Sequence, residues 1–324
     1  MPINRSTIKN FMIVAVIGII ATAVILMYAD ISSVWDALRG MDMTKLPLII
    51  FLIPLNFVIK IIRFHYYLKL SGAHIRIRDE SFALLAASTM VITPGKLGEM
   101  LLRGYLLKQL RYDISTLTIF AMMFADRLTE GLAMVVLSTC TILTFQGMAT
   151  VGSIAVIGVC IVGVVFVLQW RSLCVRLLNF VQSHTKGRFL ESICRCREAY
   201  EQSYVIFRLW SVLLSTGLGV LSWCCEAGVV FLSVQALGGS VSAAQSIFAV
   251  SFSGIVGAVS MLPGGVGVAD GTLLGILLWS GIPKDLAGAV TIISRFSTMW
   301  VGVLIGVVLL IVGHDLWYVK KVSD

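Results

Sequence analysis

The chain has 324 residues, of which 58% are hydrophobic and only 13% are charged, and its formal net charge is +8. A soluble globular domain has about 25% charged residues, so this composition excludes a water-soluble protein and predicts a membrane protein. The positive charge does not indicate nucleic-acid binding, because the basic residues gather at the ends of apolar stretches.

Six apolar stretches are long enough to cross a bilayer, which takes about 20 helical residues. In chain order they are residues 10–29, 46–68, 114–146, 150–170, 207–237 and 286–312. Residues 1–30 predict a retained first transmembrane helix, since no convincing small-residue cleavage site follows the apolar run. Residues 150–170 predict a connecting helix. The expected fold class is therefore an all-α polytopic membrane protein, with residues 1–324 in a single membrane domain.

The basic residues predict the orientation of the chain. They lie before the first stretch, after the second, between residues 171 and 206, and at the end of the chain. Residues 171–206 also contain interspersed apolar residues, which is typical of an amphipathic helix on a membrane surface. Because cytoplasmic loops carry the excess of Lys and Arg, we expect this linker and both termini to be cytoplasmic, with the chain in the bacterial inner membrane.

Two further apolar segments are each interrupted by a Pro-Gly pair. Pro94 interrupts residues 81–110, and Pro263 interrupts residues 243–280. The arms on either side have about a dozen residues, which is too few for a complete crossing. Each segment therefore predicts a re-entrant helical hairpin.

The two hairpins belong to an internal sequence repeat, with repeat 1 at residues 45–146 and repeat 2 at residues 207–313. The aligned positions are Pro94, Gly95, Gly98 and Arg127 in the first repeat and Pro263, Gly264, Gly267 and Arg295 in the second. Three predicted spans separate the hairpins, so the hairpins enter the membrane from opposite faces. This pattern predicts an inverted-topology repeat, which is typical of transporters.

A Pro-Gly break at membrane depth predicts a polar interior, because lipid cannot satisfy the freed backbone N–H and C=O groups. The half-helix after each break points its positive dipole end toward the midplane, where an anion is stabilised. The glycines assigned to a substrate site on this basis are Gly95, Gly98, Gly264, Gly265 and Gly267. The alternative is that they only allow close packing of helices.

Charged residues inside apolar segments also indicate a site, since a charge at the bilayer centre costs at least about 2.5 kcal/mol. Arg127 and Arg295 are candidates for gripping a phosphate, because a guanidinium group stays ionised and offers a bidentate fork. Lys96 is a third candidate. The carboxylates expected to pair with these bases or to carry protons are Glu99, Asp126, Glu130, Glu226 and Asp270. The alternative is that static ion pairs brace the fold.

These motifs resemble the lysylphosphatidylglycerol synthase transmembrane-region, or flippase-like, family. The resemblance covers most of the chain and is carried by Thr93 to Glu99 with Arg103, by Asp126 to Leu128, by Pro263 to Val268 and by Arg295. Asp126 and Asp270 stand where the family pattern has glutamate, which keeps the charge on a shorter side chain. The resemblance implies a lipid-moving module, here without an attached synthase domain.

The function predicted from the residues and the resemblance is a lipid flippase or scramblase. Its substrate would be an anionic phospholipid or a polyprenyl phosphate, moved between leaflets. Two alternatives stay open, which are a membrane-embedded transferase acting on a polyprenyl phosphate and an ion-coupled transporter of a small soluble anion. The sequence has no nucleotide or metal motif, so we expect no enzymatic activity, no cofactor and no metal. A lipid-synthesising enzyme is the candidate protein partner, and no nucleic acid is expected.

Overall fold

The computed structural model describes residues 31–93, 96–110, 112, 114, 116–142 and 204–322, with a few single residues between 159 and 183. Every element in these residues is helical, which confirms the predicted all-α fold class. The expected first span, the connecting helix and nearly all of the linker lie outside the described residues, so these three assignments stay predictions.

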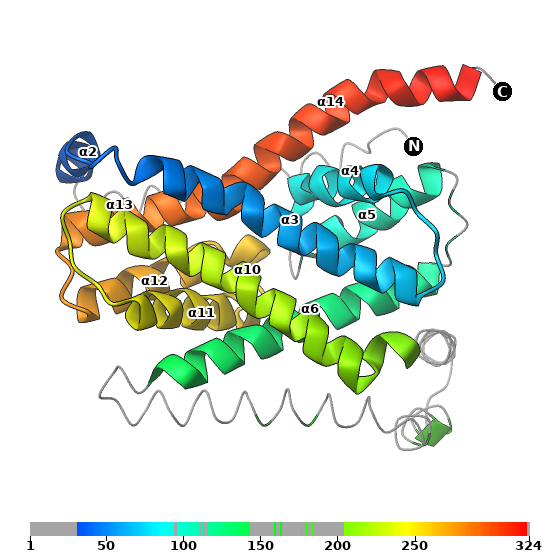
Figure 1. Cartoon of the computed structure of the whole chain (residues 1–324), viewed down its shortest axis with the longest axis horizontal. Coiled ribbons are helices and arrows are strands. Elements are labelled where there is room, and N and C mark those ends of the chain that lie inside the picture. The colour runs from blue at the N-terminus through cyan, green and yellow to red at the C-terminus, as the bar shows by residue number, and fades with distance from the viewer. Residues whose placement is uncertain are drawn as a thin grey trace.

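Among the described residues, three helices are long and apolar enough to cross a membrane. They are α3 (Leu46–Leu70), α10 (Leu209–Ala236) and the continuous helix Lys284–Gly313. Their bounds match three of the predicted spans to within two residues. Helices α3 and α10 pack side by side along the front of the molecule (Figure 1).

The last of these helices is continuous but not regular. It begins with α13 (Lys284–Arg295), passes through the π-helical turn η6 (Phe296–Trp300) and continues as α14 (Val301–Val322). π-Helical turns inside α-helices are frequent at functional sites. The turn directly follows Arg295, one of the two arginines selected from the sequence.

The third predicted span corresponds to α6 (Thr116–Thr141), which packs against α10. Its 26 residues give a length of about 39 Å, which exceeds a hydrocarbon core of about 30 Å. The predicted range was 114–146; Ile114 lies before the helix, and residues 143–146 lie outside the described part. A short helix, α2 (Ile31–Arg39), packs against α13 through Val34 and Ala289.

The first Pro-Gly break lies between two short helices that pack against each other. Helix α4 (Ile77–Ala87) and the 3-10 turn η1 (Ser88–Met90) precede the break, and α5 (Leu97–Gln109) follows it. Pro94 and Gly95 themselves lie outside the described residues. Thr93, just before the break, satisfies one N–H group of the first turn of α5, because its hydroxyl oxygen accepts a hydrogen bond of 2.7 Å from the Gly98 N–H.

The second break has the same arrangement of helices. Helix α11 (Ala243–Val259) begins with a capping box formed by Ser242 and Gln245. The turn η5 (Pro263–Gly265) interrupts the chain, and α12 (Val268–Trp279) packs back against α11. The two helices together extend from Ala243 to Trp279, and the re-entrant hairpin at residues 243–280 stays a prediction.

The two breaks meet inside the molecule. Ile92 from the first break packs with Val266 from the second in a buried apolar cluster that Met299 and Val303 complete. A Cβ atom added to Gly264 would lie 3.6 Å from the Cα of Ile92. In Figure 1 the α4–α5 and α11–α12 pairs lie on opposite sides of the molecule. The orientation of the hairpins across a membrane stays a prediction.

Candidate functional site

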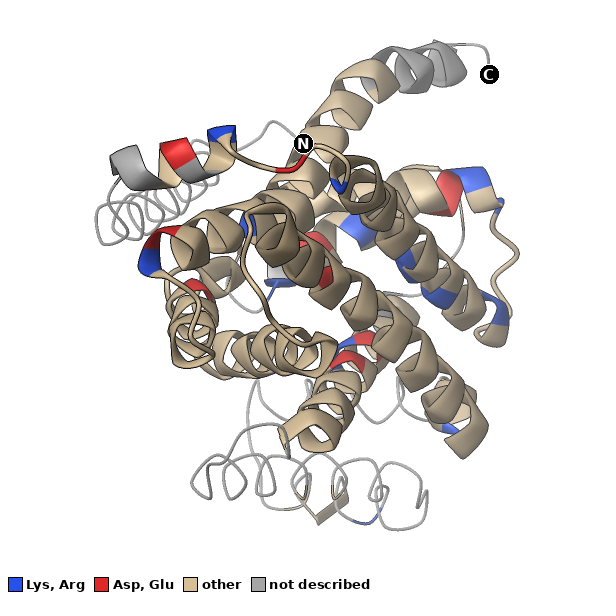
Figure 2. Cartoon of the chain, turned by 60° about the vertical axis from the view of Figure 1, so that its left-hand side comes forward, with Lys and Arg blue, Asp and Glu red and all other residues tan. Residues whose placement is uncertain are grey.

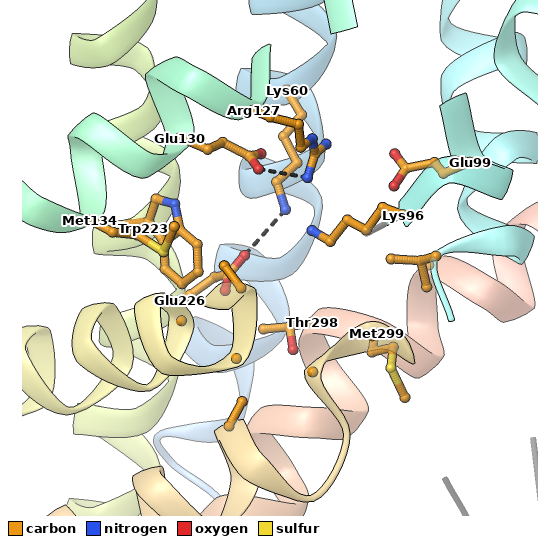
Figure 3. Close-up of a pocket in the computed structure, with 18 of the residues that line it drawn as sticks. Lys60, Lys96, Glu99, Arg127, Glu130, Met134, Trp223, Glu226, Thr298 and Met299 are labelled. Atoms are coloured by element: carbon orange, nitrogen blue, oxygen red, sulfur yellow. Dashed lines mark hydrogen bonds and ion pairs between the residues drawn. The ribbon is translucent and has the colours of Figure 1, made fainter. Parts of the chain in front are cut away.

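A pocket of about 660 Å³ lies where the two breaks meet α3, α6 and α10. Its volume is in the usual range for small-molecule sites, about 300–1,000 Å³. Charged positions occur within helices that are otherwise apolar (Figure 2). Figure 3 shows several of those that line the pocket.

Most of the sequence-predicted site residues line this one pocket. They are Lys96, Glu99, Asp126, Arg127, Glu130, Glu226, Gly264, Gly265, Asp270 and Arg295. Gly95 lies outside the described residues, and Gly98 and Gly267 are not among the described lining residues. Gly98 instead allows close packing, because an added Cβ would lie 2.5 Å from the Thr93 methyl carbon. Tertiary packing thus brings charged groups from both halves of the chain to one place.

Two arginines and two carboxylates form the centre of the site. Arg63 Nε lies 2.7 Å from Asp126 Oδ1, and Arg63 Nη2 donates to Glu130 Oε1 at 2.7 Å. Arg127 contacts the other oxygens of the same carboxylates, with Nη1 2.8 Å from Glu130 Oε2 and Nη2 3.2 Å from Asp126 Oδ2. The Arg63 side chain is 3% exposed and the Arg127 side chain 27% exposed. Each carboxylate is therefore shared between a buried and a more accessible guanidinium group.

A second cluster joins α3 to α10. Lys60 Nζ and Asn56 Nδ2 both donate to Glu226 Oε1, at 3.2 Å and 2.9 Å. The Ser222 hydroxyl donates to Asn56 Oδ1, which fixes the orientation of the amide. The Lys60–Glu226 contact is visible in Figure 3. Glu226, which lines the pocket, thus has a cationic partner and a neutral hydrogen-bond donor.

Arg295 holds the second break together. Its Nε donates to Asp270 Oδ1 at 2.6 Å, its Nη2 contacts the same oxygen, and its Nη1 donates to the Gly264 carbonyl at 3.2 Å. The other Asp270 oxygen accepts a hydrogen bond of 2.9 Å from the Gly267 N–H. Arg127, in contrast, pairs with two carboxylates of its own helix. The two aligned arginines therefore line the same pocket with different partners.

Glu99 of α5 is also neutralised. It accepts a hydrogen bond of 2.6 Å from Arg103 Nη2, one helical turn along α5. The Arg103 guanidinium carbon lies 4.7 Å from the centre of the Phe64 ring, which adds a cation–π contact.

The wall of the pocket is apolar where it reaches the molecular surface. Phe124 is 49% exposed, Met261 is 64% exposed and Leu262 is 43% exposed, and all three line the pocket. Charged groups and exposed apolar groups therefore face the same cavity. This combination is complementary to an amphiphilic molecule, which has a polar or charged group and an apolar part.

The sequence pattern of the lysylphosphatidylglycerol synthase transmembrane region matches residues 13–306. The chain belongs to this family. A UPF0104 membrane protein from Pyrococcus horikoshii is 22% identical over 335 aligned positions, which cover 95% of this chain and 98% of that protein. A UPF0104 membrane protein from Methanothermobacter thermautotrophicus is 29% identical over 109 positions, which cover 34% of this chain and 32% of that protein.

In this member of the lysylphosphatidylglycerol synthase transmembrane-region family, sequence reasoning missed two site residues. Lys60 and Arg63 both line the pocket and both pair with carboxylates. The sequence does contain a sign of their role, because both residues interrupt the apolar stretch 46–68. An ionisable residue inside a membrane span indicates a functional site. Among the described residues, no group of three or more His, Cys, Asp and Glu is arranged to hold a metal ion.

Proposed function

We propose that this protein moves a phosphate-bearing lipid, an anionic phospholipid or a polyprenyl phosphate, between the leaflets of the bacterial inner membrane. The observation that carries this proposal is the combination of a charged pocket interior with a wall of exposed apolar residues. A lipid headgroup would contact the ionised side chains around Arg127. Its hydrocarbon chains would stay against Phe124, Met261 and Leu262, which face lipid in a membrane-embedded protein.

The helical arrangement supports movement of the headgroup past the two breaks. We propose that the α4–α5 and α11–α12 pairs are the re-entrant hairpins of an inverted repeat, entering from the cytoplasmic and the outer face. Their contact at Ile92 and Val266 would then close one side of the pocket. Separation of these two residues would open that side, as alternating access requires. A lipid-synthesising enzyme would be the partner that supplies the substrate, and both termini would lie in the cytoplasm.

A bulky side chain in the pocket tests the proposal. Ala258 lines the pocket, whereas Val259 is 69% exposed and is not among the described lining residues. Purified protein with Ala258→Trp or Val259→Trp would be reconstituted into liposomes. Leaflet exchange of fluorescent phosphatidylglycerol and of a fluorescent polyprenyl phosphate would be followed by chemical quenching of the outer leaflet.

We expect the parent and Val259→Trp to exchange at least one of the two lipids at the same rate, and Ala258→Trp to slow that exchange about tenfold or more. Parent-rate exchange by a folded Ala258→Trp variant would contradict the proposal. Uptake of inorganic phosphate by the parent liposomes, without lipid exchange, would instead assign the pocket to a soluble anion.

A further inference from the structure

The charges that line the pocket do not balance. The described lining residues include six cationic side chains and five carboxylates, namely Lys60, Arg63, Lys96, Arg103, Arg127 and Arg295 against Glu99, Asp126, Glu130, Glu226 and Asp270. The ion pairs described above use all five carboxylates and every cation except Lys96. Among the described lining residues, one positive charge is therefore left without an ion pair.

Lys96 has no ion pair or hydrogen bond from its side chain to any residue that the structure describes, although it lies among charged groups. In Figure 3 its side chain extends into the pocket, toward the space between Arg127 and Glu226. An ammonium group that is withdrawn from water needs a counter-charge to be stable at membrane depth. An anion that enters the cavity would supply this counter-charge.

The backbone of Lys96 is also unusual. Its φ is +56°, in the left-handed region that residues with a Cβ atom rarely adopt. The sequence repeat aligns Lys96 with Gly265, whose φ is +66°. A positive φ is thus adopted by glycine at one of these positions and by lysine at the other. Glycine would remove the backbone strain at position 96, so the lysine side chain has a role that offsets this strain.

We infer that Lys96 binds the headgroup phosphate of a lipid with a single negative charge, a phosphodiester, and that the pocket discriminates against a doubly charged phosphomonoester. This inference rests on the proposed function, because it takes the ligand to be a lipid. One bound negative charge neutralises the pocket while every ion pair stays intact. A second negative charge would lie uncompensated beside Asp126, Glu130 and Glu226 or would have to break one of their ion pairs.

Titration of the lipid itself provides the test. Full-length protein in a neutral detergent would be mixed with dihexanoyl phosphatidylglycerol, a diester, or with dihexanoyl phosphatidic acid, a monoester, and the Kd measured by calorimetry at pH 5 and pH 8. The second pKa of a phosphate monoester is about 6. A change in the protonation of the protein affects the binding of both lipids, whereas a change in the charge of the lipid affects only the monoester. Comparing the two lipids at each pH therefore separates the two effects.

We expect the two lipids to bind with affinities within about twofold at pH 5, where both are monoanions. At pH 8 the monoester should bind about tenfold more weakly than the diester. Equal affinities at pH 8, or tighter binding of the monoester, would overturn the inference. Absence of binding of either lipid to the parent protein would overturn the proposed function as well.

Variants at one position test the role of the side chain. Lys96→Gln should weaken phosphatidylglycerol binding about tenfold, and Lys96→Arg should restore most of it because the charge is kept. Lys108→Gln, the same change at an exposed position of α5, should bind like the parent. A folded Lys96→Gln variant that binds with the affinity of the parent would contradict the role of Lys96 in phosphate binding. The exchange assay on Ala258→Trp would still test the proposed function separately.

Discussion

Arg63 Nε lies 2.7 Å from Asp126 Oδ1, and the same guanidinium group holds Glu130, so one buried side chain of α3 fixes two carboxylates of α6. The Arg63 side chain is 3% exposed, which leaves water little access to the pair. Loss of one partner from a buried ion pair costs about 3–5 kcal/mol, because the remaining charge is stranded. The arginines that line the pocket therefore differ in what they contribute to stability.

Arg63→Gln should lower the free energy of unfolding by about 3–5 kcal/mol. Arg127→Gln should lower it by only about 1 kcal/mol, because Arg127 is more exposed and Arg63 still holds both carboxylates. Unfolding in mixed detergent micelles, followed by circular dichroism, measures both variants. Equal stability of the two variants would show that the buried pair does not brace α3 against α6.

Lys96→Gly should be more stable than Lys96→Gln by about 0.5–1 kcal/mol. Both changes remove the unpaired charge, but only glycine relieves the strain of the left-handed backbone. Part of this gain is lost, because glycine loses more chain entropy on folding than glutamine does. The same unfolding titration compares the two variants. A glutamine variant at least as stable as the glycine variant would argue against backbone strain at this position.

Gly306→Ala should destabilise the packing of α14 against α4 by about 1–3 kcal/mol. A Cβ atom at Gly306 would lie 2.7 Å from the Leu85 carbonyl oxygen, and a backbone atom cannot move aside as a flexible side chain can. Gly217→Ala in α10 is the matched control, since an added Cβ there meets nothing within 4 Å. The control should gain about 0.5–1 kcal/mol from helix propensity. Destabilisation of both variants to the same extent would contradict the close approach of α14 to α4.

Arg295→Gln should loosen the second break, because Arg295 contacts both Asp270 and the Gly264 carbonyl. Hydrogen exchange of the Gly265 and Val266 amides, which donate within the turn, should accelerate about tenfold. Arg127→Gln should leave these amides unchanged, since its partners lie on α6. Unchanged exchange in Arg295→Gln would mean that the turn holds its shape without the arginine.

The proposed inverted arrangement of the hairpins predicts that their bases are accessible from opposite sides of the membrane. Arg76 immediately precedes α4, and Lys284 begins α13 just after α12. In a background without native cysteines, Lys284→Cys in intact cells should react with an impermeant thiol reagent, and Arg76→Cys should react only after the membrane is opened. Labelling of both positions from the same side would make the hairpins parallel.

The sequence alone determined the helical architecture and the places where it breaks. Apolar stretches of sufficient length fixed α3, α10 and the last helix, because lipid requires internally satisfied backbone hydrogen bonds. Proline and glycine fixed the second break at Pro263, because proline lacks an N–H and glycine allows the positive φ of the turn. Both effects are local in the chain.

Only the tertiary structure decided which charges neutralise one another. Arg63 and Glu130 are far apart in the sequence, and so are Lys60 and Glu226, so no local pattern connects them. Ion pairing depends on distances of a few ångströms, which are set by how α3 packs against α6 and α10. This packing commits Arg127 to carboxylates of its own helix and leaves Lys96 without a described partner.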